Sequence, residues 1–449
     1  MFKDFKYDGV WFLPEKPDEK FHGTLTYDCA EGTELSLNGC FKPLHNFNKD
    51  NVVLGECGGA PRITLLGCTY KKPAEHGMDS SIYYYGAEST LIGAHFPERA
   101  AIKFKALKVQ DLNTRSWLGE TTSYNNGNIR HAFDPVHVAS LEDVNIEILP
   151  GVGGGDRPYL IIKASVAEAH NILRAISDRF HDLLSLATGT PVVATDICGF
   201  VDENTEVKIY HAPRYSGKPV IILRDDMVFT FDDISRNSQA VFTSWFNSWK
   251  EIEAVHELYF SNLCRPAPYP RARFLSYVQA LEVYHRQMIM KKNLPILINE
   301  FEARKKRMYS TMNPEDKKWF HKRMNYGYEP TQRDRLKEIL DLLPVPFALE
   351  KKQRDNLVGV IVSTRNYYVH LDQSSMEGVV TDEHKIWHLA QRLKMLVEVL
   401  LLNELGFDEQ TRTKVFENLN NRYSYLKEVV DPPTSKDSGD AQETSAHTG

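Results

Sequence analysis

Three residues in the last quarter of the chain, Arg365, Asn366 and His370, have the types and spacing needed to cleave RNA without a metal ion. An imidazole can take or give a proton near neutral pH, at the ribose 2′-hydroxyl or at the leaving oxygen. A guanidinium stays charged and can stabilise the negative charge that builds up on a phosphorane. In a helix, Asn366 and His370 are nearly stacked, and Arg365 lies about 140° from His370, so all three fit one broad face. Val362 and Val369 share this arc, which favours a helix packed against a partner with a small cleft between them.

The alternative is a structural role for the same residues, because an arginine and a histidine five positions apart occur by chance in many proteins. Other catalytic patterns are absent from the sequence, including Gly-x-Ser-x-Gly, His-Glu-x-x-His and the phosphate-binding Walker motif. His384 and His388 are four positions apart, but no acidic residue completes a zinc site between them. The six cysteines contain no Cys-x-x-Cys pair. The sequence therefore predicts neither a metal nor a cofactor.

A basic segment precedes the motif. Residues 291–337 carry thirteen Lys and Arg against six Asp and Glu, a net charge of +7 within a chain of net charge −6, with aromatic residues between them. One interpretation is a solvated helix face. The other is an RNA surface, where cations meet phosphates and rings stack on bases. On the second interpretation, the candidate RNA-binding residues are Lys305, Lys306, Arg307, Lys317, Lys318, Lys322 and Arg323.

The composition is that of a globular protein of two or three domains. The chain has 449 residues, of which 42% are hydrophobic and 25% charged. Its 49 Phe, Tyr and Trp residues argue against wholesale disorder, and its net charge of −6 argues against a globally polybasic nucleic-acid binder. The first twenty residues do not resemble a signal peptide, and no apolar run is long enough for a membrane helix. We therefore expect a cytoplasmic protein without a membrane association.

The sequence pattern of the first half of the chain predicts β-strands. Short β-branched and aromatic runs, such as 23–27, 33–38 and 159–163, are separated by Gly, Asn, Asp and Pro clusters. This spacing favours a β-sandwich or an open barrel. A helical pattern at 168–187 interrupts the strands, and further strands are expected at 192–195, 206–210 and 220–223. We place the end of the β-rich N-terminal domain at residue 235.

The sequence pattern of the second half of the chain predicts α-helices. Helical periodicity and punctuating prolines predict an all-α bundle over residues 236–430. Residues 431–449 have no large apolar side chain and are expected to form a disordered tail. The fold class predicted from the sequence is therefore an α+β multidomain protein, with a sandwich-like β domain followed by a helical bundle.

These patterns together resemble a known family. Arg365-Asn-Tyr-Tyr-Val-His370, inside a helical bundle and followed by a long amphipathic helix, resembles the R-x4–6-H motif of HEPN ribonucleases. The wider pattern resembles the ApeA-like anti-phage proteins within that group. The segments that carry this resemblance are Trp11-Phe-Leu-Pro, Phe21-His-Gly-Thr-Leu25, Leu35-Ser-Leu-Asn-Gly39, Phe274-Leu-Ser-Tyr-Val-Gln-Ala-Leu-Glu282 and Arg333-Asp-Arg-Leu-Lys-Glu-Ile-Leu340.

The resemblance implies a metal-independent endoribonuclease that acts as a growth-arresting toxin in abortive infection. It implies cleavage of cellular RNA, with tRNA as one candidate, to 2′,3′-cyclic phosphate and 5′-hydroxyl ends. It also implies a homodimer or higher oligomer in which Arg365, Asn366 and His370 of two subunits share one cleft. The N-terminal domain would respond to a phage-derived trigger. The alternative is a non-catalytic HEPN protein that binds a ligand or partner through its β-rich domain.

Overall fold

The computed structural model describes residues 4–41, 51–59, 61–76, 81–119, 123–125, 128–130, 134–141, 143–151, 157–215, 217–324, 326–370 and 376–428. The chain divides into two compact units. The β-rich unit comprises Met1–Asn247, Leu263–Arg265 and Leu405–Arg412, and the helical unit comprises Ser248–Asn262, Pro266–Glu404 and Thr413–Gly449. The domain boundary at residue 235 stays a prediction, and the tail predicted at 431–449 lies outside the described residues.

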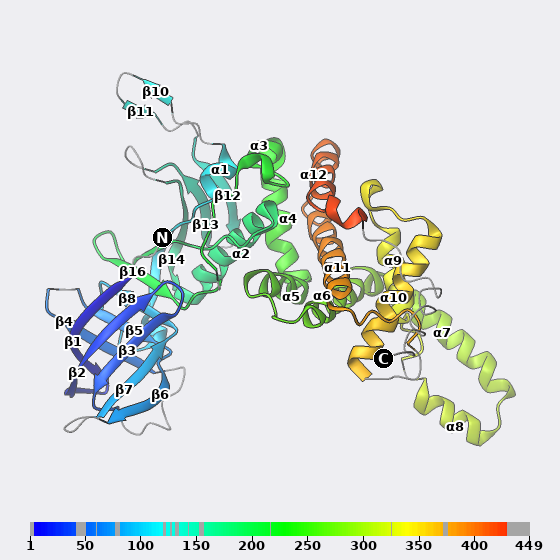
Figure 1. Ribbon diagram of the computed structural model, residues 1–449, viewed down its shortest axis with the longest axis horizontal. Helices are drawn as coiled ribbons and strands as arrows, with labels where there is room; N and C mark the ends of the chain where they lie inside the picture. The colour runs from blue at the N-terminus through cyan, green and yellow to red at the C-terminus, as the bar shows by residue number, and fades with distance from the viewer. Residues whose placement is uncertain are drawn as a thin grey trace, which may run out of the picture. The chain divides into compact units, whose positions relative to one another are not determined.

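The β-rich unit is built on one antiparallel sheet, which confirms the predicted fold class of this half (Figure 1). Its strands are β1 (Phe5–Leu13), β2 (Lys16–Asp28), β3 (Gly32–Asn38), β4 (Val52–Cys57), β5 (Ile63–Leu66), β6 (Thr69–His76), β7 (Ser81–Ala87), β8 (Ser89–Ile92), β9 (Lys103–Gln110), β12 (Val136–Leu141), β13 (Val144–Leu149), β14 (Tyr159–Ala169), β15 (Asp196–Phe200) and β16 (Glu206–His211). They lie in the order β12-β13-β14-β9-β15-β16-β8-β5-β4-β1-β2-β3-β7-β6. A separate ladder pairs β10 (Ser123–Asn125) with β11 (Asn128–Arg130).

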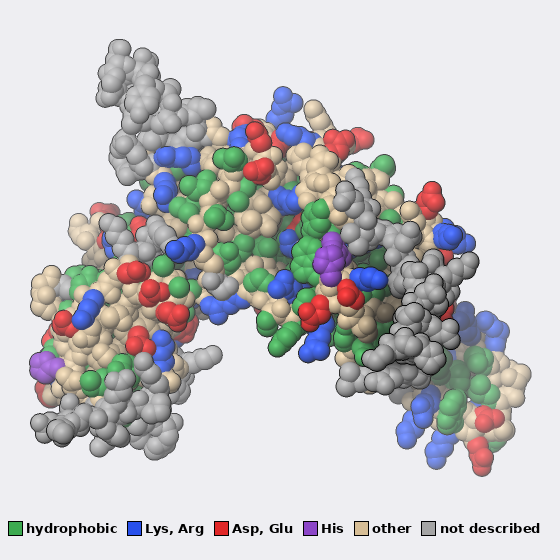
Figure 2. Space-filling model, in the orientation of Figure 1, with side chains coloured by type: hydrophobic (Ala, Val, Ile, Leu, Met, Phe, Trp, Pro, Cys, Tyr) green, Lys and Arg blue, Asp and Glu red, His purple; other side chains and the backbone are tan. Residues whose placement is uncertain are grey.

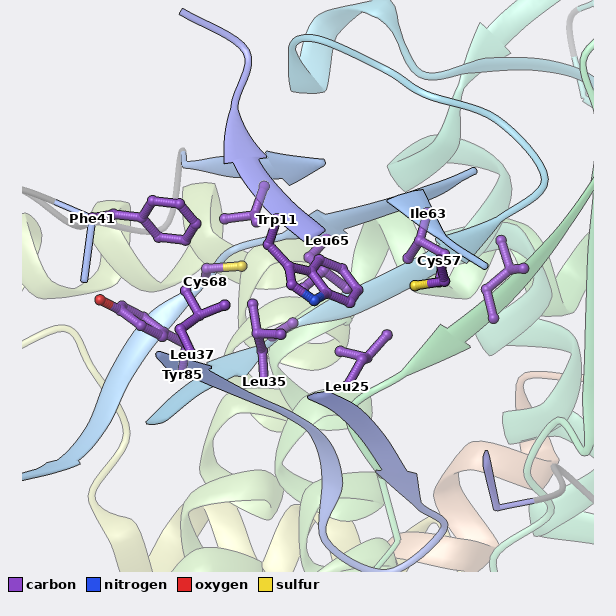
Figure 3. Close-up of a cluster of buried hydrophobic side chains, with 13 residues drawn as sticks. Trp11, Leu25, Leu35, Leu37, Phe41, Cys57, Ile63, Leu65, Cys68 and Tyr85 are labelled. Carbon is purple, nitrogen blue, oxygen red and sulfur yellow. The ribbon is translucent and has the colours of Figure 1, made fainter. Parts of the chain in front are cut away.

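The first strands close around one apolar cluster centred on Trp11 (Figure 3). Alternate residues of each strand point into it, as Leu35 and Leu37 do in β3, because successive side chains in a strand face opposite sides. The Trp11 indole Nε1 donates to the carbonyl oxygen of Gly23, 3.1 Å away. Gly55 in the neighbouring β4 has no side chain to obstruct the indole, since an added Cβ would lie only 2.2 Å from the ring.

Two of the predicted strands are wrong. Residues 192–195 and 220–223 are not strands, because other groups bind their backbone. The amide of Val192 donates to Ser185 Oγ, 2.8 Å away. The Asn113 side chain donates to the carbonyl of Val220 and accepts from the amide of Ile222, so it satisfies the groups that a strand neighbour would otherwise bind.

The long helix predicted at 168–187 is α2 (His170–Thr188), which packs against β9 and β14. Gly189 ends it in the left-handed conformation, with φ of +74°, and its amide donates to the carbonyl of Ser185. Two shorter helices, α1 (Thr114–Leu118) and α3 (Phe231–Ile234), are the other α-helices among the described residues up to 235.

A buried histidine at the start of α2 is expected to make this unit less stable in acid. Burial, together with Arg174, lowers the pKa of His170 to about 4, and its ring stacks on His211 with centroids 5.1 Å apart. Because the pKa of His170 is lower in the folded state than in the unfolded state, the fold favours the neutral ring. The stability associated with the neutral ring is present above about pH 6.5 and is lost as the pH falls towards 4. For His170 this loss amounts to about 3 kcal/mol of the free energy of unfolding.

We therefore expect the free energy of unfolding in urea to fall between pH 7 and pH 4.5, and to fall less steeply in a His170→Phe variant. Part of the slope should remain, because burial also lowers the pKa of His211. Identical slopes for the wild type and the variant would contradict this assignment.

The helices from residue 238 onward match the predicted bundle. The first is α4 (Ser238–Glu251), most of which belongs to the β-rich unit, and a break at Ile252 separates it from α5 (Glu253–Cys264). Next comes α6 (Pro270–Tyr284), which continues through a π-helical turn at His285–Met290. The remaining helices are α7 (Lys291–Thr311), α8 (Pro314–Arg323), α9 (Gln332–Asp341), α10 (Lys351–His370), α11 (Glu383–Asn403) and α12 (Glu409–Arg422).

The helical unit has a charged group at its centre. Glu398 of α11 is fully buried and accepts hydrogen bonds from the hydroxyls of Tyr259 and Tyr423, at 2.5 and 3.0 Å. Burial alone raises the pKa of Glu398, but the cations of Lys394 and Arg422 outweigh it and the pKa is lowered. The paired carboxylate anchors α11, against which α6 packs.

Candidate functional site

The R-x4-H motif occupies the last two turns of α10, and one face of this helix is held in the bundle. Leu357, Val358, Ile361 and Thr364 recur at helical spacing and are buried. These side chains form the buried face of α10, which packs against α9 and α6. Two ion pairs reinforce the contact with α9, one from Lys337 to Asp355 at 3.0 Å and one from Arg354 to Asp341.

The C-terminal half of α10 is also tied to the segment that leads into α11. Thr364 Oγ1 accepts from the amide of Val380 at 3.0 Å, and the Tyr368 hydroxyl donates to the carbonyl of the same residue at 3.3 Å. Thr364 and Tyr368 are four residues apart and therefore share one side of the helix. These two bonds determine which residues of the motif remain directed away from the bundle.

Arg365 lies at the edge of the packed face. Its Nε is 4.0 Å from Glu282 Oε1 of α6, and its Nη1 donates to Asn366 Oδ1 at 3.3 Å. Glu282 Oε1 also accepts from Gln332 Nε2, 2.7 Å away, at the start of α9. Both Arg365 and Glu282 keep 29% of their side-chain surface exposed, so the guanidinium is oriented by the bundle yet remains accessible.

Asn366 and His370 lie on the opposite, exposed side of α10. Val369 between them is 48% exposed, although it is apolar. The structure thus brings Arg365 and Asn366 together, whereas no hydrogen bond or ion pair joins His370 to either one within the part of the chain that the structure describes. The expected packing of this face against a partner is not found in the described helical unit. One copy therefore presents an oriented cation, an amide and an imidazole around an unpartnered apolar residue.

Sequence reasoning did not assign a role to the residues that orient Arg365. Glu282 and Gln332 come from helices about 80 and 30 residues earlier in the chain. Thr364 and Tyr368 lie within the motif helix, but their partner Val380 follows the motif. Helical spacing within α10 could have placed Thr364 on the buried face; no signal in the sequence points to Glu282.

Most of the basic segment forms an arm made of α7 and α8, and its last residues lie on α9. α7 has no buried residue, and α8 buries only Phe320. The two helices are joined by ring contacts, with Tyr309 and Phe320 centroids 5.7 Å apart. Figure 2 shows Lys and Arg side chains over these helices, with hydrophobic side chains between them.

The predicted RNA-binding residues differ in exposure. Lys306 and Arg307 on α7 are exposed, as are Lys318, Lys322 and Arg323 on α8. Lys317 is half-buried. Lys305 is also half-buried, because its ammonium pairs with Glu302 at 3.0 Å and lies over the Phe301 ring. Trp319 is 63% exposed beside Arg323, whose guanidinium lies 5.9 Å from the ring centroid.

The part of the chain that the structure describes contains neither a metal-binding cluster nor a membrane-spanning helix. Among the residues with a described placement, no group of three or more His, Cys, Asp or Glu side chains could hold a metal ion. Over the same residues, no helix is long and apolar enough to cross a membrane.

Comparisons with known families match both halves of the chain. A model described as ApeA N-terminal domain 1 matches residues 6–245, which is more than half of the chain. A model described as Apea-like HEPN matches residues 275–411, which include the whole of α10 and α11. No curated protein and no solved structure matched the chain.

Proposed function

This chain belongs to the ApeA-like HEPN family, and from that premise we propose that it is a metal-independent endoribonuclease of anti-phage defence. HEPN domains generally act on RNA and are often dimeric, and the ApeA-like group is associated with defence against phage. The observation that carries the proposal is the exposed face of α10. There, Asn366 and His370 flank an apolar residue without a described partner, beside an arginine that Glu282 and Asn366 orient.

We propose that the unpartnered face of α10 packs against the same face of a second copy. A two-fold axis places identical surfaces together, so Val369 of each copy would be covered and each cleft would receive residues from both. The active form is then a homodimer or a higher homo-oligomer formed through the helical unit. Two copies supply two guanidiniums and two imidazoles around one phosphate, whereas one copy supplies a single pair set apart on the helix.

In the proposed reaction, the ribose 2′-oxygen attacks the adjacent phosphorus and the bond to the 5′-oxygen breaks. One His370 takes the proton of the 2′-hydroxyl, and the other gives a proton to the leaving 5′-oxygen. Arg365 stabilises the charge on the phosphorane, and Asn366 holds the guanidinium in place. The products carry 2′,3′-cyclic phosphate and 5′-hydroxyl ends.

The biological role we propose is growth arrest in the cytoplasm of an infected cell. The helical unit would cut cellular RNA, with tRNA as one candidate substrate, and the β-rich unit would respond to a phage-derived trigger. The test is to sequence RNA ends from cells that express the wild type or His370→Ala. New 5′-hydroxyl ends in the wild type alone support the proposal, and equal ends in both would reject the assignment of His370.

We expect the α7–α8 arm to contribute phosphate contacts to RNA binding. Changing Lys306, Arg307 and Lys318 to Glu should weaken RNA binding at least about 10-fold at low salt and flatten its salt dependence, because fewer counterions are released. These three side chains are exposed, so the changes should not affect folding. The measurement is RNA affinity by fluorescence anisotropy at several salt concentrations.

A matched control carries the same change in charge elsewhere in the helical unit. Lys351, Lys352 and Lys385 are exposed, and their replacement by Glu should leave the slope of affinity against salt unchanged. If both triple variants behave alike, the arm is a solvated surface rather than an RNA contact.

A further inference from the structure

The β-rich unit contains a cavity of about 290 Å³, and none of its lining residues belongs to the motif helix. Its walls come from the end of β2, from α2, from the segment that leads into β15, and from the loop that follows β16. Much of the lining is apolar and is contributed by Val192, Val193, Ala194, Ile197, Pro213 and Pro219. The volume is at the small end of ligand sites, which run from roughly 300 to 1,000 Å³.

The charged groups of this cavity are mostly cations. Arg174, Arg214 and Lys218 line it, and Asp178 is the acidic residue among its lining residues. Asp178 is 3.8 Å from the Arg174 guanidinium and 4.0 Å from that of Arg214. Arg174 is also 3.9 Å from Glu88, and Arg214 pairs with Asp182, but neither of these carboxylates lines the cavity. Lys218 has no ion pair with any described residue. The lining itself therefore presents three cations and one carboxylate.

The side chain of Arg214 is oriented by a buried carboxylate. Its Nη2 donates to Asp182 of α2, with distances of 2.8 and 2.9 Å to the two carboxylate oxygens. The Asp182 side chain is 1% exposed, whereas that of Arg214 is 32% exposed. A buried carboxylate that orients a partly exposed guanidinium is an arrangement that lowers the entropy cost of binding an anion.

We propose that this cavity binds a small organic anion no larger than about a nucleoside monophosphate, with a flat apolar body and one carboxylate or phosphate group. The apolar body would lie against the Val192–Ala194 segment and the prolines. The anionic group would meet Arg174, Arg214 and Lys218. Such a ligand could be a nucleoside monophosphate or an aromatic carboxylate, which share this chemistry.

Calorimetric titration of the whole chain distinguishes a nucleotide ligand from an aromatic carboxylate ligand. AMP and indole-3-acetate each carry both parts of the expected ligand, whereas adenosine lacks the anion and ribose 5-phosphate lacks the flat apolar body. We expect AMP or indole-3-acetate to bind. If AMP binds, adenosine and ribose 5-phosphate should each bind at least about 10-fold more weakly, a difference of about 1.4 kcal/mol. Binding of AMP alone would identify the nucleotide source, and binding of indole-3-acetate alone the carboxylate source.

Two variants locate the binding in this cavity. Lys218→Glu reverses an exposed charge and should weaken binding at least about 10-fold. Ala194→Phe should fill the apolar part and abolish binding. Lys6→Glu on β1 is exposed, does not line the cavity, and has the same change in charge, so it should bind as the wild type does.

The inference is overturned if neither AMP nor indole-3-acetate binds, or if Lys218→Glu binds like Lys6→Glu. Because Lys218 is exposed, the second result could not be attributed to misfolding. The readout is heat of binding and involves no RNA cleavage. A protein without ribonuclease activity would therefore still test the cavity, and failure here would leave the proposed ribonuclease untouched.

Discussion

His370→Ala protein is expected to cleave RNA on the order of 10²-fold or more slowly than the wild type, because removal of a proton-transfer group costs that much. Arg365→Ala is expected to lose a similar factor, because a charge stabiliser at the phosphorane is missing. The measurement is single-turnover cleavage of a labelled RNA, with the 2′,3′-cyclic phosphate product quantified. The magnesium chelator EDTA should leave the wild-type rate unchanged, since the proposed chemistry uses no metal.

Matched controls separate chemistry from folding. His370 is exposed and Arg365 partly exposed, so neither change opens a core cavity, and melting temperatures should stay within a few degrees of the wild type. His22→Ala and Arg333→Ala remove the same side-chain types from other exposed positions and should cleave normally. If His370→Ala cleaves as fast as His22→Ala, then His370 takes no part in the reaction.

The second large effect is expected on mixing two inactive variants. Arg365→Ala and His370→Ala should each be nearly inactive, and a mixture that is allowed to exchange subunits should regain at least about 10-fold of the lost activity. The reason is that each heterodimer holds one intact Arg365 and one intact His370, whereas each homodimer lacks one of these residue types entirely. With a single His370 left for proton transfer, the rescued rate should stay below that of the wild type. Cleavage rates measured before and after subunit exchange give the rescue directly.

The interface itself can be tested with Val369→Glu. Val369 is 48% exposed in one copy, so the change should be harmless to the fold. In a dimer it would place two carboxylates against each other, and light scattering should show a shift towards monomer together with loss of cleavage. As a control, Val345→Glu alters a side chain that is 89% exposed and does not belong to α10, and this variant should remain dimeric. A wild type that is monomeric and fully active would rule out the shared cleft.

Local patterns were sufficient for much of the fold. The alternation in β3 and the helical spacing in α2 each predicted an element that the structure contains, because both report which side of a chain segment is apolar. The strands expected at 192–195 and 220–223 failed because side chains bind the backbone groups that a neighbouring strand would need. Ser185, seven residues before Val192, binds the first segment, and Asn113, more than 100 residues before Val220, binds the second.

For the motif, too, the sequence predicted one part and the tertiary structure decided the other. Residue types and spacing by themselves predicted Arg365, Asn366 and His370 as one candidate set, since chemistry and helical geometry are properties of the sequence. Which side of α10 faces the bundle was decided by the tertiary structure. The burial of Ile361 and Thr364 and the bonds to Val380 turn Asn366 and His370 outwards. Glu282 could orient Arg365 only once α6 and α10 were packed together, because the two residues are 83 positions apart in the chain and meet through the fold alone.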